Sequence, residues 1–165
     1  MNQLPKYSLI AAMDYNKIIG NQNKIPWKAK GEQALFKRIT ENSVVIMGRN
    51  TYESLPNGAL KERYNAVLSK NPNFEAIGCF TFSSFEKALV SMSEEFPMCE
   101  IFVIGGASLY AQTIENAEEL HITRIEKSYE GDAYFPNYDN NKFNLKNIEW
   151  YHTNVRYIYY HYIRK

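Results

Sequence analysis

The acidic side chain of Glu32 is the group in this sequence whose position most suggests chemistry. If residues 30–40 form a helix, Glu32 shares one face with Leu35, Phe36 and Ile39, because residues three, four and seven apart lie together. A carboxylate in an apolar face must be protonated, paired or available to a ligand that donates hydrogen bonds, because burying it alone is costly. The alternative is an acid of the first helical turn that stays in water and complements the helix dipole.

Three further motifs suggest a site for a phosphorylated dinucleotide. Gly105-Gly106 separates an apolar segment, 100–104, from a helical one, 107–114, and free amides at the start of such a helix favour a phosphate. Gly48-Arg49-Asn50-Thr51 repeats this arrangement with a cation that a bound anion would stabilise. Ser69-Lys70 adds a hydroxyl and an ammonium. Taken singly, a sterically required glycine turn explains Gly105-Gly106 equally well. For Arg49 and Lys70, each taken alone, a solvated surface cation is the favoured explanation.

The order of elements that must position these residues is typical of an α/β protein. Strands are predicted at 7–13, 43–47, 64–68, 77–81, 100–104 and 120–125, helices at 30–40, after Gly48, at about 83–96 and at 107–114, and a final hairpin at 148–152 and 155–164. This alternation predicts a three-layer fold with a largely parallel central sheet of about eight strands, flanking helices and a C-terminal antiparallel hairpin.

Ligands on such sheets bind beyond the carboxyl ends of the strands. The motifs above lie at these ends, as does Ala11-Ala12 after the first strand. The polar loop 14–29 is long for a compact domain, and loops of that length are usually functional. We therefore expect a ligand site at this edge of the sheet.

Bulk properties narrow the class of protein. The 165 residues predict a single domain, 1–165, and a composition 45% hydrophobic and 22% charged is typical of a globular chain. The net charge of +1 argues against a nucleic-acid partner. We find neither an apolar run of membrane-span length nor a signal peptide, and Cys79 and Cys99 read as free thiols, so a cytoplasmic location is expected. Because no long exposed apolar stripe is evident, we expect a monomer.

No metal site or hydrolase motif is predicted. His121, His152 and His161 lie in strand-like segments without metal-ligand spacing, so they are interpreted as structural or surface residues. Neither a Ser-His-Asp order nor a phosphate-binding loop of the kinase or NTPase type is visible.

The chain resembles dihydrofolate reductases of the bacterial chromosomal type. The matching segments span nearly the whole chain in the family's order and include Ser8 to Ala12, Ile18-Ile19-Gly20, Ile25-Pro26-Trp27 with Glu32, Val45 to Arg49, Val103 to Gly106, and Gly131 to Pro136. No single match is decisive, but together they are very specific.

The resemblance implies NADPH-dependent reduction of 7,8-dihydrofolate to tetrahydrofolate, with hydride transfer to C6 and water-mediated protonation of N5. It makes Glu32 the acid that binds the pterin, Thr123 its hydrogen-bonded neighbour, Trp27 a residue that helps hold a water, and Tyr110 a neighbour of the nicotinamide. Loop 14–29 would be the lid over this site. Antifolate inhibitors are expected to bind there.

The resemblance also implies the remaining site residues. Those expected to bind substrate are Ile10, Ala11, Phe36, Leu55, Leu60, Arg63 and Ile104, with Arg63 holding the α-carboxylate of the glutamate tail. Those expected to bind the cofactor are Ala12, Ile19, Gly20, Gly48, Arg49, Asn50, Thr51, Ser69, Lys70, Gly105, Gly106, Ala107, Ser108 and Leu109. A cis peptide bond is expected at Gly105-Gly106.

The chain departs from the family pattern at several positions. The acid is Glu32 rather than the Asp of many bacterial members, Gln33 replaces a usual apolar contact, and Ser108 stands where some members carry an arginine. Segment 29–33 resembles trimethoprim-insensitive reductases of mobile elements, which leads to the hypothesis of reduced trimethoprim sensitivity. Two alternatives are a pyrimidine reductase of riboflavin synthesis, which the Pro26-Trp27 and Glu32 constellation disfavours, and a non-catalytic folate- or nucleotide-binding relative.

Overall fold

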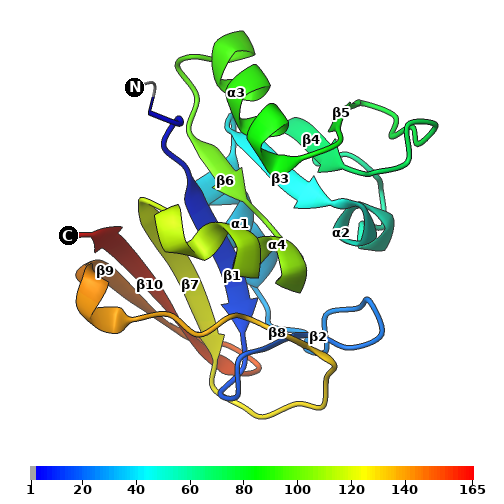
Figure 1. Ribbon diagram of the computed structural model, residues 1–165. Helices are drawn as coiled ribbons and strands as arrows, with labels where there is room; N and C mark the ends of the chain where they lie inside the picture. Colours follow the sequence, from blue (N-terminus) through cyan, green and yellow to red (C-terminus); the bar gives the residue numbers. More distant parts are fainter. Residues whose placement is uncertain (1–2) are drawn as a thin grey trace.

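A largely parallel sheet organises the chain because its central strands are apolar on both faces and must be covered on both. The computed structural model in Figure 1 describes residues 3–165. Its eight-stranded sheet has the order β5-β4-β3-β6-β1-β7-β10-β9, and β2 pairs separately with β8. The strands are β1 (Ser8–Met13), β2 (Ile18–Gly20), β3 (Val44–Gly48), β4 (Tyr64–Leu68), β5 (Cys79–Phe82), β6 (Ile101–Val103), β7 (Glu119–Ile125), β8 (Ala133–Tyr134), β9 (Phe143–His152) and β10 (Arg156–Arg164).

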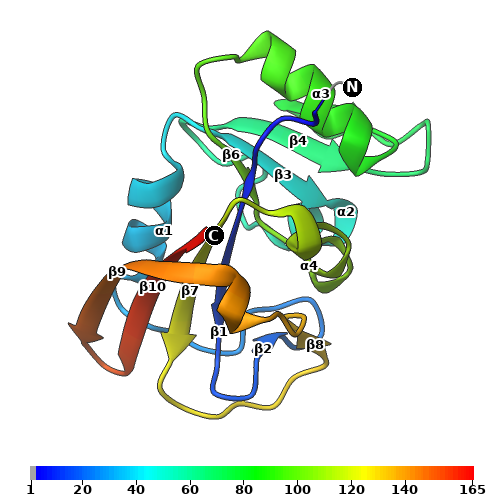
Figure 2. The same ribbon diagram turned by 60° about the vertical axis from the view of Figure 1, so that its left-hand side comes forward.

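Helices cover both faces of this sheet (Figures 1 and 2). They are α1 (Glu32–Thr40), α2 (Arg49–Ser54), α3 (Phe85–Glu95) and α4 (Ala107–Thr113), with short 3₁₀ turns η1 (Ile114–Asn116) and η2 (Asn140–Lys142). Residues of α3 and α4 join the larger apolar cluster on one face. Residues of α1 and α2 pack against two smaller clusters on the other face. The core is therefore divided by the sheet into two layers.

The predicted fold class is confirmed. Strands β1 to β7 of the main sheet run parallel, and β10 and β9 add two antiparallel strands at one edge. Some element bounds differ from the prediction. Helix α3 begins at Phe85, after Ser84, whose hydroxyl accepts from the amide of Lys87, and strand β9 begins five residues before the predicted 148. Phe143 is buried, Asn144 to Asn147 are exposed, and a register shift opposite His161 and Tyr162 interrupts the alternation by which a single strand is recognised.

The long loop 14–29 is held at its base by a buried carboxylate. Asp14 accepts hydrogen bonds from the amides of Asn16, Ile18 and Tyr129, at 2.8, 2.9 and 2.8 Å. Within the loop, β2 pairs with β8, a strand pair that the sequence did not reveal because both members are very short. Gly131 permits the pairing, since a Cβ there would lie 2.4 Å from Cγ2 of Ile18.

In the part of the chain that the structure describes, none of the helices has the length and apolar character needed to cross a membrane.

Candidate active site

A cleft of about 1630 Å³ opens at the carboxyl edge of the parallel strands. Its walls come from the ends of β1, β3, β4 and β6, from loop 14–29 and from α1, α2 and α4. The structure therefore brings together segments that are up to about a hundred residues apart in the sequence, at the edge where a ligand site was expected.

Nearly all residues named from the sequence line this cleft. The lining includes Glu32, Trp27 and Tyr110, all seven predicted substrate residues and all fourteen predicted cofactor residues. Thr123 is the exception: it is buried in β7, where it pairs with Ala12 of β1. Sequence reasoning did not name Asn23, Lys24, Ser54, Asn57, Lys61 and Gln112, which also line the cleft. The sequence pointed to these residues only through their closeness along the chain to the residues predicted to bind substrate or cofactor.

Gly31 determines how Glu32 enters the cleft. Its φ of 88° lies in the left-handed region, which lets the chain turn sharply into α1. A Cβ at this position would lie 2.9 Å from the hydroxyl of Tyr157, which donates a hydrogen bond of 2.7 Å to the carbonyl of Lys30. Glu32 is thus the first residue of α1. The alternative interpretation, an acid in the first helical turn, is therefore correct about its position along the helix.

The carboxylate of Glu32 is nevertheless withdrawn from water. Its residue is half-buried, and burial raises the pKa of the carboxyl group above its usual value. Among residues 3–165, no hydrogen bond or ion pair lowers that pKa again. Tyr110 lies close by: burial and the negative charge of Glu32 both raise the pKa of its phenol, and its hydroxyl donates to the carbonyl of Ile10 at 2.6 Å.

Two buried donors on the lining also lack a protein partner. The indole N–H of Trp27 and the Nε–H of Arg63 find no acceptor in the described part of the chain. Burial lowers the pKa of Arg63, whose Nη1 donates to the hydroxyl of Thr40 at 3.2 Å. Since buried donors almost always have a hydrogen-bond acceptor, both N–H groups are suited to donating to a ligand or to a water molecule.

The opposite part of the cleft is built from glycine turns. The amide of Gly48 donates to the carbonyl of Gly105 at 2.9 Å, which joins the ends of β3 and β6, and the Gly105-Gly106 peptide bond is cis, as expected. Within the described residues, neither α2 nor α4 receives a side-chain cap, so their first amides are available to an anion.

Arg49 already has a protein partner at this end. Its Nε lies 2.6 Å from Oε1 of Glu53, one turn further along α2, and its guanidinium stacks on Phe74. Glu53 and Phe74 therefore partly offset the unfavourable interaction of the Arg49 cation with the helix dipole, without any bound anion. The sequence did not predict these partners. Lys70 is exposed at the end of β4.

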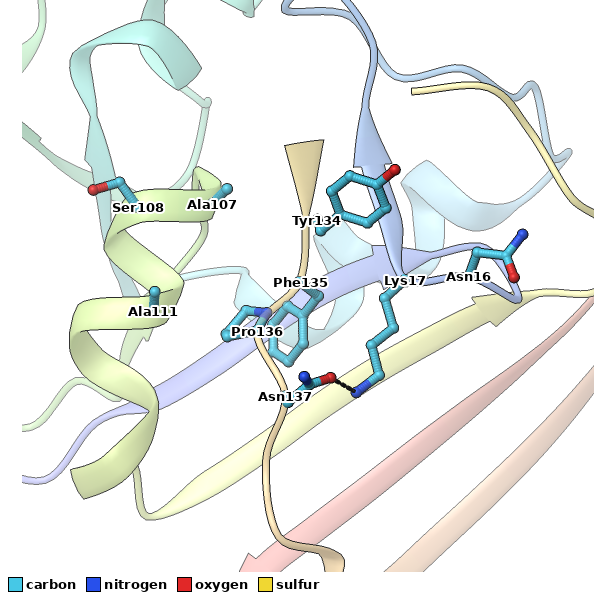
Figure 3. A pocket seen from close by; sticks show the side chains of 9 residues that line it. All are labelled: Asn16, Lys17, Ala107, Ser108, Ala111, Tyr134, Phe135, Pro136 and Asn137. Atoms are coloured by element: carbon cyan, nitrogen blue, oxygen red, sulfur yellow. Dashed lines mark hydrogen bonds between the residues drawn. The ribbon is translucent and has the colours of Figure 1, made fainter. Parts of the chain in front are cut away.

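A second, smaller hollow of about 520 Å³ lies between α4 and the segment 134–137 (Figure 3). It shares Ala107 and Ser108 with the large cleft, and at its rim Lys17 donates to the side chain of Asn137 at 2.9 Å. The carboxylate of Glu32 lines the large cleft and not the smaller hollow, so the large cleft is the candidate active site.

Comparison with known proteins agrees with this geometry. A family model described as dihydrofolate reductase matches residues 6–164. The chain is 36% identical over 157 residues to dihydrofolate reductase type A13 of Escherichia coli, covering 95% of this chain and 93% of that protein. It is 39% identical over 142 residues to the dihydrofolate reductase of Bacillus subtilis, covering 86% and 82%.

A solved structure shows the same arrangement. Dihydrofolate reductase from Enterococcus faecalis, complexed with NADP(H) and an inhibitor named RAB-propyl, superposes with a TM-score of 0.87 at 26% identity, covering 97% of this chain and 96% of that one. The fold and these relatives define an α/β oxidoreductase. The chain belongs to the dihydrofolate reductase family, whose members are enzymes that use NADPH.

We predict that Glu32→Gln stabilises the ligand-free protein at neutral pH. The folded-state pKa of Glu32 is raised, so the folded protein retains this proton over a pH range in which the unfolded chain has lost it. Stability of the wild type therefore falls as pH rises from about 4.5 through the folded-state pKa, and the amide variant escapes this loss. Urea unfolding across this range should show an advantage of the variant that grows and then levels off. The exposed Glu86→Gln is the control, and an advantage independent of pH would contradict the prediction.

Proposed function

We propose that this protein catalyses the NADPH-dependent reduction of 7,8-dihydrofolate to 5,6,7,8-tetrahydrofolate. The observation that supports this most directly is the carboxylate of Glu32, which lines the cleft and has no protein partner within the described residues. A pterin presents a ring N–H and an exocyclic amino group side by side, and one carboxylate can accept hydrogen bonds from both. Such a ligand would compensate the burial of the charge.

The apolar walls fit the rest of a dihydrofolate molecule. Ile10, Phe36, Leu55, Leu60 and Ile104 belong to one cluster and line the cleft on the side of α1 and α2. Flat, apolar rings bind well between such side chains. Ala11 would complete this wall from the end of β1.

Arg63 is suited to the glutamate tail. Its guanidinium keeps one buried N–H without a partner in the described chain, and a carboxylate could accept from it in a bidentate pair. Arg63 lines the same cleft as Leu55, Leu60 and Glu32, so it would bind the tail while the pterin binds Glu32.

The glycine turns fit the cofactor. When bound, NADPH supplies the hydride that reduces the C6–N5 bond. Ala12, Ile19 and Gly20 would border its nicotinamide, and the uncapped starts of α2 and α4 would donate to its phosphates. Ser69 and Lys70 would hold the adenosine end together with Arg49. Because Ser108 provides no cation, we assign the charge there to Arg49 and Lys70.

The proton for N5 requires a water rather than direct transfer from Glu32. We assign Trp27 to the orientation of this water, because its indole N–H is buried without a protein acceptor in the described residues. A negative charge on Glu32 would raise the basicity of N5. Thr123, buried in β7, would act through the position of the acid and not by lining the cleft.

Loop 14–29 would form the lid that limits the access of bulk water. Its base is fixed by Asp14 and by pairing with β8, while Asn23, Lys24 and Ile25 line the cleft. A fixed base and a tip that reaches the ligands suit such a lid.

Family membership favours this function over a pyrimidine reductase of riboflavin synthesis. Turnover of NADPH with dihydrofolate would distinguish an active enzyme from a non-catalytic binding relative. We further propose a cytoplasmic monomer, as composition suggests, and sedimentation of the purified protein tests the oligomeric state.

Dihydrofolate-dependent oxidation of NADPH is the direct test. The wild type should consume NADPH on addition of dihydrofolate, whereas Glu32→Gln should lower kcat/KM by about 10² or more at neutral pH, because it removes the charge that favours protonation of N5. Glu86→Gln should behave as wild type. Absence of turnover by the wild type would refute the enzyme assignment, and a fully active Glu32→Gln would refute the role of the acid alone.

Arg63→Ala should raise KM for dihydrofolate by about tenfold or more, since the variant loses a charge-assisted pair with the tail. Reduction of a dihydropterin that lacks the aminobenzoyl-glutamate tail should be unchanged. Arg38→Ala, an exposed arginine that pairs with Glu149, is the control. Equal losses for both substrates would show that Arg63 does not recognise the tail.

Reduced trimethoprim sensitivity is proposed from the segment Ala29 to Gln33. The inhibition constant for the wild type should lie well above the nanomolar range. Glu32→Asp shortens the acid by one methylene, and we expect it to tighten inhibition, because the longer stem of Glu32 seats the carboxylate differently from the aspartate of many family members. Inhibition of the wild type by low nanomolar trimethoprim would rule the proposal out.

A further inference from the structure

The strand pair β7–β10 carries a second cluster of ionisable side chains, separate from the cleft. Glu119 and His121 lie on the same face of β7, and His161 stands directly opposite His121 on β10. One possible ligand atom from each residue lies within 4.8 Å of the others. The cluster lies at the amino end of β7 and near the carboxyl end of β10, the strand that leads to the C-terminus in Figure 1. The cleft is at the carboxyl end of the parallel strands.

The contacts within this cluster leave one buried nitrogen unused. His121 is 6% exposed, its ring stacks on that of His161 with centroids 4.1 Å apart, and its Nε2 finds no hydrogen-bond partner among residues 3–165. On the other side, Nε2 of His161 lies 2.6 Å from Oε1 of Glu119. A buried imidazole nitrogen without a partner is uncommon in a folded protein and calls for an acceptor of its lone pair or proton.

The surroundings of His121 favour the form of the ring that binds a metal. Its Nδ1 lies 2.6 Å from the hydroxyl of Tyr159, which can accept the Nδ1 proton and so leave the lone pair on Nε2. Histidine ligands of metals almost always donate their second nitrogen to such a partner.

We propose that Glu119, His121 and His161 form a zinc-binding site that joins β7 to β10. Two imidazole nitrogens and one carboxylate are a common ligand set of Zn²⁺, with water as the fourth ligand. The ligand atoms of tetrahedral zinc are about 3.4 Å apart at bond lengths of about 2.0–2.1 Å. The 2.6 Å contact between Glu119 and His161 must therefore widen, while separations that approach 4.8 Å must close. Glu119 and His161 can provide this movement, because both are only partly buried and open to solvent.

The charges around the site support a divalent cation of modest affinity. Glu119 supplies one negative charge to balance it, while the nearby Lys146 opposes it. The proposal differs from the interpretation of these histidines as structural or surface residues. Glu119 and His121 are two residues apart in the sequence, but His161 joins them only through strand pairing.

Titration of the untagged, metal-free protein with Zn²⁺ in competition with a chromophoric chelator tests the proposal. We expect one zinc per chain, and we expect Glu119→Gln and His161→Gln each to weaken binding by at least about tenfold. His152→Gln, which changes the exposed third histidine, should bind as wild type. Zinc should raise the melting temperature of the wild type and of His152→Gln, but not of the two cluster variants.

Cobalt provides an independent readout on the wild type if a variant fails to fold. Co²⁺ should give visible bands of a nitrogen and oxygen ligand set without thiolate charge transfer, which separates this cluster from Cys79 and Cys99. No stoichiometric binding, binding that both cluster variants retain, loss of binding in His152→Gln, or a thiolate spectrum would each overturn the proposal.

Discussion

The desolvated carboxylate of Glu32 is the constraint around which the cleft is organised. A charge in this position lowers the stability of the ligand-free protein. The conformation of the backbone before α1 holds the Glu32 side chain there. Gly31 turns the chain into α1 in a conformation that an L-residue rarely adopts, and Tyr157 holds the preceding carbonyl. The acid is thus fixed by its neighbours on β10, at a distance of more than a hundred residues in the sequence.

The second half of the cleft depends on how closely two strand ends approach. The hydrogen bond between Gly48 and Gly105 brings the turns after β3 and β6 together, and a side chain on Gly106 would come within 3.3 Å of the hydroxyl of Thr51. Because the turns are so close, the uncapped starts of α2 and α4 face one cleft. An acid without a partner among residues 3–165 lies at one end of the cleft and uncapped helix starts lie at the other, which suits the proposed reaction.

The antiparallel edge formed by β7, β10 and β9 has a separate role in the architecture. At one end it supplies Tyr157, which supports the entry into α1, and at the other it carries the cluster of Glu119, His121 and His161. An antiparallel partner can bring residues of distant sequence into direct opposition, as it does for His121 and His161. This edge therefore both supports the active site and gathers a second set of potential ligands.

The sequence by itself determined the alternation of strands and helices, the parallel sheet and the motifs at the carboxyl ends of its strands, while most individual site residues were implied by the family resemblance. These depend on local signals: apolar runs for β1, β3 and β6, and the glycine turns that follow two of them. Tertiary structure alone decided the partners. The pairing of β2 with β8 was hidden because each strand is too short to show a period, and Arg49 proved to have Glu53 and Phe74 beside it. Whether Glu32 stays in water, and whether His121 meets His161, depends on packing between elements far apart in the chain, and a one-dimensional pattern does not encode that packing locally.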